Sequence, residues 1–188
     1  MFNDQFERKP AAAYDRGVGL FNEFISANYA DSTEIASINH FIKDIYEQIY
    51  FSRPLPLWKI DSSRFLQIDS IIDTSGLREE FRDYGIQKNS KDSLLHFNWD
   101  GDYYTALQVI SLNNDPILRY IKDLEGIGGF SFIIATRMLH DSKSYEIADP
   151  NVLSRIIFAE IFSDMLKWIS VIQNDPNVGL PEIVKKRS

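Results

Sequence analysis

The residues best suited to bind a metal ion lie on one predicted helix, where His40, Asp44 and Glu47 are separated by four and three positions. This spacing places the three side chains on one helix face, and imidazole and carboxylate groups are common metal ligands. The same helix, however, carries an apolar stripe on its opposite face. Because metal ligands in a helical bundle project into its interior, a face turned away from the stripe is typical of solvent-exposed residues. We therefore expect no metal site and no cofactor.

A second set of ionisable residues occupies the last predicted helix. Glu160 and Asp164 lie about one turn apart, with Lys167 beside them, on the polar strip of a mostly apolar helix. The strip also includes Ser163 and Ser170. Burial of this strip would raise the pKa of each carboxyl group and make both of them candidates for acid–base chemistry. The interpretation we favour is that the strip faces solvent. Glu160, Asp164 and His140 are nevertheless the candidates for a pocket inside the bundle.

No recognisable motif provides a catalytic nucleophile. The chain has no cysteine, which excludes disulfide bonds and thiolate chemistry, and it contains no Gly-x-Ser-x-Gly sequence. Residues 98–102 are rich in oxygen ligands, but Tyr103 and Val109 stand where a calcium-binding loop needs glycine and glutamate. A turn at 100–102 that also caps the next helix is the better interpretation. Whether the protein is an enzyme stays open, and the sequence favours a non-catalytic role.

The charge of the chain argues against two classes of partner. Its 188 residues include 27 acidic and 20 basic ones, for a formal net charge of -7. Nucleic acids and anionic membranes attract clustered lysine and arginine, and the dense basic cluster of this chain is confined to 185–187. We expect neither partner. The N-terminus lacks the apolar run of a secretory signal and the stretch 126–135 is too short to span a bilayer, so we expect a cytoplasmic protein.

The aromatic content is high, at 13% of the residues. Aromatic side chains fill protein cores first and anchor protein interfaces second. We expect most of them to lie in the core. Trp58 and Trp99 are the candidates for anchors at an interface.

The clearest structural signal is a stripe of isoleucines. The residues Ile35, Ile38, Ile42, Ile45 and Ile49 recur at alternating spacings of three and four. This period predicts an amphipathic helix over 32–51. The helix begins after the capping sequence 31–34 and ends before the prolines at 54 and 56.

Similar patterns predict helices along the rest of the chain. They cover 16–29, a segment that begins at Asp61 or Ser62, 77–84, 102–112, 114–126 and 149–173. Residues 130–139 fit either a strand or a buried helix, and the helical neighbours favour the helix. The most apolar helix, 149–173, belongs in the middle of the bundle or against a partner subunit.

The sequence thus predicts an all-α protein, a single-domain bundle of about seven or eight helices with short loops. The helical domain covers 16–173, between a loose lead-in at 1–15 and a tail at 174–188. We expect a helical protein–protein interaction module whose partner is another protein or a second copy, forming a homo-oligomer. One alternative is a helical-bundle enzyme, or a carrier of a cofactor or small ligand, with an aromatic-lined pocket. The other is an acidic inhibitor or immunity-type protein that blocks a basic partner.

Overall fold

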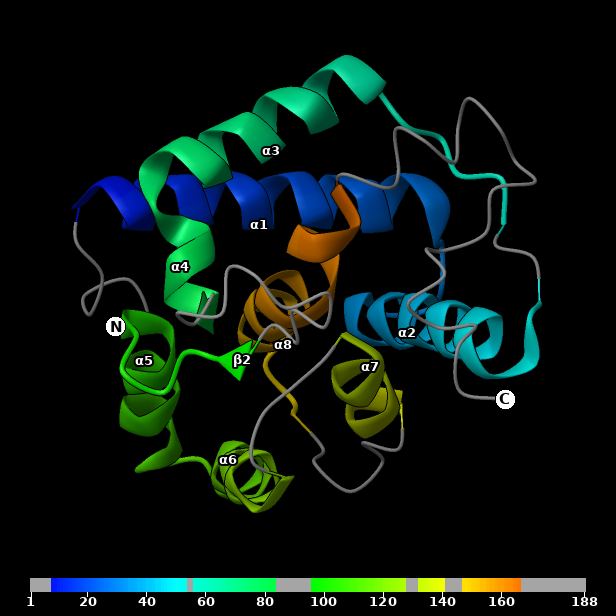
Figure 1. Ribbon diagram of the computed structural model, residues 1–188. Coiled ribbons are helices and arrows are strands. Elements are labelled where there is room, and N and C mark those ends of the chain that lie inside the picture. Colours follow the sequence, from blue (N-terminus) through cyan, green and yellow to red (C-terminus); the bar gives the residue numbers. More distant parts are fainter. Residues whose placement is uncertain (1–7, 54–55, 84–95, 128–131, 141–146, 167–188) are drawn as a thin grey trace.

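The computed structural model describes residues 8–53, 56–83, 96–127, 132–140 and 147–166, and these residues form an all-α fold (Figure 1). Its helices are α1 (Arg8–Asn28), α2 (Glu34–Phe51), α3 (Ser62–Ser75), α4 (Leu77–Phe81), α5 (Asp102–Ser111), α6 (Asp115–Ile127), α7 (Phe132–His140) and α8 (Pro150–Ile157), which continues into the π-helix η3 (Phe158–Phe162). Two short strands, β1 (Arg82–Asp83) and β2 (His96–Phe97), pair antiparallel. The predicted all-α bundle of seven or eight helices is confirmed.

Polar residues begin several helices at the predicted positions. Thr33 precedes α2 and its hydroxyl accepts a hydrogen bond from an amide of the first turn. The carboxylates of Asp61 and Asp149 accept hydrogen bonds from amides in the first turns of α3 and α8. Pro150 follows Asp149 at the first helical position. Such caps satisfy amides that have no partner within the helix. The local sequence therefore determines where these helices start.

The turn before α5 is also present, but its cap differs from the prediction. The side-chain oxygen of Asn98 accepts a hydrogen bond from the amide of Asp100 at 3.1 Å, which closes the turn. The amide of Asp102 donates to the Glu80 carboxylate on α4 at 2.8 Å. A residue distant in sequence, which local pattern cannot identify, thus caps α5.

The first helix begins earlier than the sequence predicted. Residues 8–15 were expected to belong to the loose lead-in, but α1 starts at Arg8. Pro10 lies in the first turn, where proline is tolerated because its missing N–H would have no helical partner. Ala13 and Tyr14 are buried in the core, so tertiary packing supports a helix that lacks a periodic signal. The remainder of the predicted lead-in, 1–7, and the predicted tail, 174–188, lie outside the described residues.

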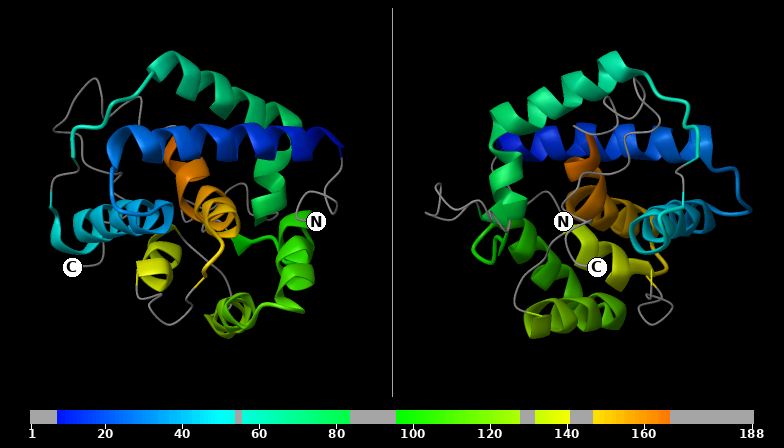
Figure 2. Two further views of the ribbon diagram at one scale, coloured as in Figure 1. Left: turned by 180° about the vertical axis from the view of Figure 1, so that it is seen from behind. Right: turned by 45° about the vertical axis from the view of Figure 1, so that its right-hand side comes forward.

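The helices surround α8, which runs through the middle of the molecule (Figures 1 and 2). Helices α1 and α3 lie side by side along one edge, while α2 and α7 form a second pair and α5 and α6 a third. The short helix α4 leads from the end of α3 toward α5. Of the two places predicted for the most apolar helix, the middle of the bundle is where its described residues lie, and the protein's own helices cover them. Residues 167–173 of the predicted helix lie outside the described part of the chain.

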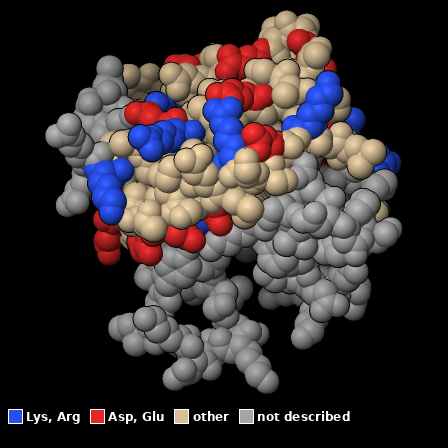
Figure 3. Space-filling model, turned by 90° about the horizontal axis from the view of Figure 1, so that it is seen from above, with Lys and Arg blue, Asp and Glu red and all other residues tan. Residues whose placement is uncertain are grey.

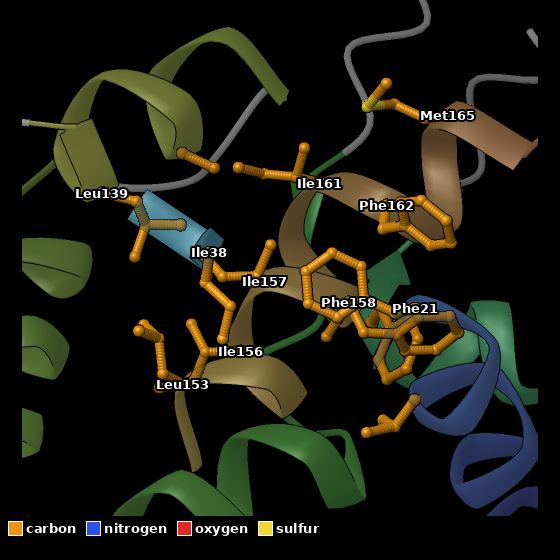
Figure 4. Close-up of a cluster of buried hydrophobic side chains, with 14 of the residues drawn as sticks. Phe21, Ile38, Leu139, Leu153, Ile156, Ile157, Phe158, Ile161, Phe162 and Met165 are labelled. Atoms are coloured by element: carbon orange, nitrogen blue, oxygen red, sulfur yellow. The ribbon is translucent and has the colours of Figure 1, made fainter. Parts of the chain in front are cut away.

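Side chains from α8 and η3 form the centre of the core. They point toward Phe21 of α1, Ile38 of α2 and Leu139 of α7 (Figure 4). The fully buried apolar residues of the central helix include Ile156, Ile157, Phe158, Ile161 and Phe162. Burial of each such side chain contributes roughly 1.5–3 kcal/mol, so this cluster contributes substantially to stability.

Close packing joins α1 to η3 at Gly17. A Cβ atom added at Gly17 would lie 2.6 Å from Cε2 of the Phe158 ring, so the ring occupies the space that a side chain would fill. At Gly19, two residues along the same helix, an added Cβ meets no described atom within 4 Å. Gly17 is thus required by packing, whereas Gly19 is not.

Residues that the sequence left ambiguous between strand and helix are helical. The helix α7 covers 132–140, and its residues Ala135 and Leu139 are buried against the core. Residues 130 and 131 lie outside the described part of the chain. The described part of the short apolar run is therefore a buried helix. The alternation of its residue types, which had suggested a strand, does not correspond to one.

Candidate functional site

An irregular turn interrupts the central helix. Between Phe158 and Phe162 the helix is π-helical, and the amide of Ser163 donates to the Phe158 carbonyl five residues earlier. Residues 163–166 return to α-helix. Such turns are rare and occur frequently at functional sites. The helical period of 3.6 residues, from which we predicted this helix, did not predict the π-helical turn.

Glu160 lies within the π-helical turn and its side chain is 0% exposed. The next residue of the predicted polar strip, Ser163, is also buried. The expectation that this strip faces solvent was therefore wrong for both residues. Helices α1, α4 and α5 pack over this part of the central helix. The sequence of one helix does not show directly which other helices pack on it.

Tyrosines from neighbouring helices surround Glu160. Tyr103 of α5 interacts electrostatically with Glu160, and the ring centroids of Tyr103 and Tyr14 are 6.5 Å apart. Burial, together with the negative charge of Glu160, raises the pKa of Tyr103 well above its usual value. Tyr120 of α6 is also fully buried and interacts with Tyr103. The cluster keeps neutral phenols around one carboxyl group in the core.

Tyr14 links this cluster to the start of the π-helical turn. Its hydroxyl donates to the carbonyl oxygen of Arg155 at 2.9 Å, and the Arg155 guanidinium lies 5.4 Å from the Tyr14 ring centroid. Burial raises the pKa of Tyr14, while Arg155 lowers it and Glu160 raises it further. The hydroxyl therefore stays protonated and can donate to a carbonyl next to the irregular turn.

The second predicted pocket residue, Asp164, belongs to a network centred on Arg78. The Arg78 side chain is buried and donates to Asp73 and Asp69, at 2.6 Å each. It also donates to the carbonyl oxygen of Ser163 at 3.1 Å, and its Nη1 lies 3.7 Å from Asp164. Burial lowers the pKa of Arg78, but the hydrogen bond to Asp73 and the nearby carboxylates raise it above its ordinary value. This charged network fastens α3 and α4 to the end of the π-helical turn.

Sequence reasoning missed Arg78, although one signal pointed to it. Asp69 and Asp73 are four residues apart on α3 and therefore share a face. Gly76 then ends the helix with a left-handed backbone, at φ 79°, and reverses the chain so that Arg78 can reach both carboxylates. Two acids on one face before a glycine turn and an arginine form a pattern that can be tested in other sequences.

The third predicted pocket residue, His140, lies in different surroundings. It ends α7 and stacks on Tyr46 of α2, with ring centroids 3.8 Å apart and an interplanar angle of 5°. Glu160 contacts tyrosines, Asp164 contacts Arg78, and His140 contacts Tyr46. The structure thus places the three candidates in three settings and gives no common pocket formed by them.

His140 belongs instead to a group of rings at the end of α2, which we call the α2-end patch: Tyr46, Tyr50, Phe51 and His140. The ring centroids of Tyr46 and Tyr50 are 4.6 Å apart, and those of Tyr46 and Phe51 are 6.0 Å apart. Tyr50 is 39% and Phe51 63% exposed, among the most exposed large apolar side chains that the structure describes. Exposed aromatic residues that contact one another are typical of binding surfaces.

The surroundings of the α2-end patch are polar and carry both signs of charge. Arg53 donates to the Glu47 carboxylate at 2.7 Å, and Lys43 lies 3.9 Å from the same carboxylate. Ser52 follows the last residue of α2 as its cap, and its φ of 51° is left-handed. This conformation is uncommon for residues other than glycine. It turns the chain directly after Phe51.

The two predicted interface anchors are half-buried and packed on the protein itself. Trp58 donates from its indole nitrogen to the Tyr29 hydroxyl at 2.9 Å, and its ring centroid lies 5.3 Å from that of Phe24. Trp99 packs edge-on against Tyr104, with centroids 5.1 Å apart. Both rings therefore have intramolecular roles. The more exposed aromatic residues, Tyr50 and Phe51, were not singled out by the sequence, although both lie outside the isoleucine stripe.

The three residues considered as metal ligands have different partners. His40 is exposed and its Nδ1 lies 3.1 Å from Asp31. Asp44 accepts from the Tyr29 hydroxyl at 3.0 Å, and Glu47 pairs with Arg53. Within the described residues, no group of three histidine or acidic side chains is arranged to hold a metal ion.

The face of the molecule seen in Figure 3 carries lysine and arginine interspersed with aspartate and glutamate. This face therefore lacks a broad field of a single sign. Arg64 of α3 also forms an ion pair with Glu23 of α1. No helix in the part of the chain that the structure describes is long and apolar enough to cross a bilayer.

Comparison of the chain with protein-family models, with curated proteins and with solved structures finds no match. Arguments about its function therefore depend on the residues described above.

Proposed function

We propose that this protein is a non-catalytic protein-binding module and that it binds its partner through the α2-end patch. The observation that carries the proposal is the exposure of Phe51 and Tyr50, whose rings, with Tyr46 and His140, form a contiguous aromatic surface. Aromatic residues contribute much of the binding energy at protein interfaces because they bury a large area with few rotatable bonds. We place this module in the cytoplasm.

The surroundings of the patch support this proposal. At the centre of a protein interface, apolar rings are typically enclosed by polar residues that exclude water once the partner is bound. Lys43, Glu47 and Arg53 lie near the patch and already form ion pairs with one another. Holding these side chains in place before binding reduces the entropy lost on association.

Quantitative capture experiments test the proposal. Tagged wild-type protein is incubated with extract of the organism that encodes it, beside the double variant Tyr50→Ser, Phe51→Ser. The control is Leu112→Ser, because Leu112 at the end of α5 is 79% exposed and lies outside the patch. We expect at least one protein, untagged copies of this chain included, to be captured by wild type and control and reduced tenfold or more with the double variant. Capture that is equal for all three proteins would contradict the proposal.

Binding of a small ligand inside the bundle is the second candidate, because Glu160 is buried within a π-helical turn among tyrosines. A buried carboxyl group surrounded by phenols suits a small cation or amine. Thermal-shift measurements with a panel of amines test this on wild type and Glu160→Gln. Stabilisation of wild type alone would favour this candidate. Stabilisation of neither protein would leave Glu160 a structural residue.

The third expectation, an acidic inhibitor of a basic partner, receives less support from the same surface. The proposal of an interaction module uses exposed aromatic rings, and charges of both signs surround them. A surface that blocks a basic groove would instead present mainly carboxylates.

A further inference from the structure

The charge around the α2-end patch differs from the charge of the protein as a whole. The chain has a formal net charge of -7. The charged residues on and just after the second half of α2 are Lys43, Asp44, Glu47 and Arg53. Two are basic and two are acidic, so the charges that α2 contributes around the patch balance.

We propose that the occupant of the α2-end patch is a second copy of this chain, related to the first by a two-fold axis through the patch. This inference rests on the proposed function and specifies its partner. In a two-fold interface the same surface meets itself, so every group on it must tolerate its own copy. A patch of aromatic rings bordered by both signs of charge satisfies this condition.

Electrostatics select this surface over other parts of an acidic protein. Two molecules that each carry a charge of -7 repel each other, and the repulsion is smallest where the facing surfaces are neutral. Lys43 and Arg53 of one copy can face Asp44 and Glu47 of the other. A basic partner, in contrast, would be attracted most strongly to surfaces with an excess of carboxylates. Balanced charges around the patch of an acidic molecule therefore favour a second copy over a basic protein.

The aromatic rings supply the favourable free energy of association, and the balanced charges around them do not oppose it. Phe51 is 63% exposed, and Tyr50 lies beside it at the end of the helix. Exposed apolar rings contribute favourable free energy when they are removed from water, and paired rings contribute further through edge and stacked contacts. Two copies would bury both sets of rings in one contact.

Light scattering and sedimentation over a range of concentrations test this proposal on the purified full chain. We expect the mass of wild type to rise from 21.8 kDa toward twice that value with concentration. The double variant Tyr50→Ser, Phe51→Ser should stay monomeric, and Leu112→Ser should associate as wild type does. Circular dichroism establishes that each variant is folded.

A second pair of variants tests the role of charge. Lys43→Glu, Arg53→Glu makes the surroundings of the patch acidic, while Arg119→Glu, Lys122→Glu changes two exposed residues of α6 and alters the net charge equally. We expect the first pair to raise the dissociation constant at least tenfold at low salt and the second to raise it much less. Added salt should reduce the difference, because it screens repulsion between exposed charges.

The outcomes separate this inference from the proposed function. Suppose that wild type is monomeric at all concentrations and that a different protein is captured through the patch. This result would overturn the proposal that the partner is a second copy, and the proposed binding module would stand. Monomeric protein with no patch-dependent capture overturns both. Association that persists in the double variant places the contact elsewhere and also overturns the inference.

Discussion

The π-helical turn and the end of α2 both gather aromatic side chains, but their surroundings differ. Around the turn, Phe158 and Phe162 are fully buried, and aromatic rings of α1, α2, α3 and α4 pack on them. At the end of α2, Tyr50 and Phe51 contact other rings while keeping a large part of their surface exposed. Aromatic content alone therefore does not separate core from interface. The elements that pack over each ring make the distinction.

The polar groups of the two regions differ in the same way. Next to the turn, Arg78 and Tyr14 donate to backbone carbonyls, and most of their surface is removed from water. Around the patch, the Glu47 and Arg53 pair lies in a half-exposed setting. Changes in the first region should alter the free energy of unfolding, whereas changes in the second should alter association.

The largest effect is expected from Arg78→Ala. This change leaves Asp69 without its guanidinium partner and removes the donor to the Ser163 carbonyl. Loss of one partner of a buried ion pair costs about 3 kcal/mol or more. Urea denaturation followed by circular dichroism measures the loss. The control, Arg64→Ala, removes an exposed pair with Glu23 and should change the midpoint little; equal losses would mean that the Arg78 network does not hold the turn.

A smaller effect is expected from Gly17→Ala. The new methyl group would overlap the Phe158 ring, and overpacking of a core typically costs about 1–3 kcal/mol. The matched control is Gly19→Ala on the same helix, where the added methyl group meets open space and alanine should stabilise the helix by about 0.5–1 kcal/mol. Opposite signs for the two changes would support the packing described here, and a gain in stability at both positions would contradict it.

Alkaline pH should destabilise the folded protein through its buried tyrosines. Burial and Glu160 raise the pKa of Tyr103, burial also raises that of Tyr14, and burial with the hydrogen bond to Glu125 raises that of Tyr104 to about 12. A raised pKa means that the folded protein retains these protons more strongly than the unfolded chain. This stabilisation is complete below the ordinary value of 10.0 and is lost as the pH rises through the folded values, near 12 for Tyr104.

We therefore expect the free energy of unfolding to fall as the pH rises above 10. The buried phenols should ionise only as the helical signal is lost. Phenolate absorbance and circular dichroism, recorded in one titration, compare the two events. Ionisation of all nine tyrosines near pH 10 in a protein that stays helical would contradict the burial of the cluster.

The smallest effect on stability is expected at the patch. Phe51→Ser should change the free energy of unfolding by less than about 0.5 kcal/mol, because exposed residues away from special features contribute little. Thermal denaturation should be measured at dilution, so that self-association does not contribute to the midpoint. A loss as large as that of Gly17→Ala would mean that Phe51 is part of the core, and the contrast between the two regions would disappear.

Much of the fold was predictable because its signals are local. Capping residues such as Thr33, Asp61 and Asp149 lie next to the helices they begin, and the isoleucine stripe gives the period of α2 directly. The start of α1 was missed because Ala11 to Ala13 carry no period, and their helix depends on burial against distant segments.

The candidate sites were less predictable because they depend on contacts between distant residues. Glu160 was named as a pocket candidate on a strip that we expected to face solvent, yet its burial depends on helices that precede it by about 40 residues and more. Trp58 and Trp99 were named for their size, but hydrogen bonding and ring packing within the chain determine how much of each stays exposed. Asp164 and His140 have partners on α4 and α2 that no sequence spacing connects.

The five-residue hydrogen bond from Ser163 back to Phe158 has an evolutionary consequence. A turn closed in this way holds one residue more than an ordinary helical turn, so a single inserted codon is enough to create it. A related protein whose lineage lacks the insertion would align with this chain before and after 158–162. The two aligned segments would be separated by a gap of one residue. Such a gap, together with glycine at 17 and an aromatic residue at 158, would be a mark of common ancestry where overall identity has faded.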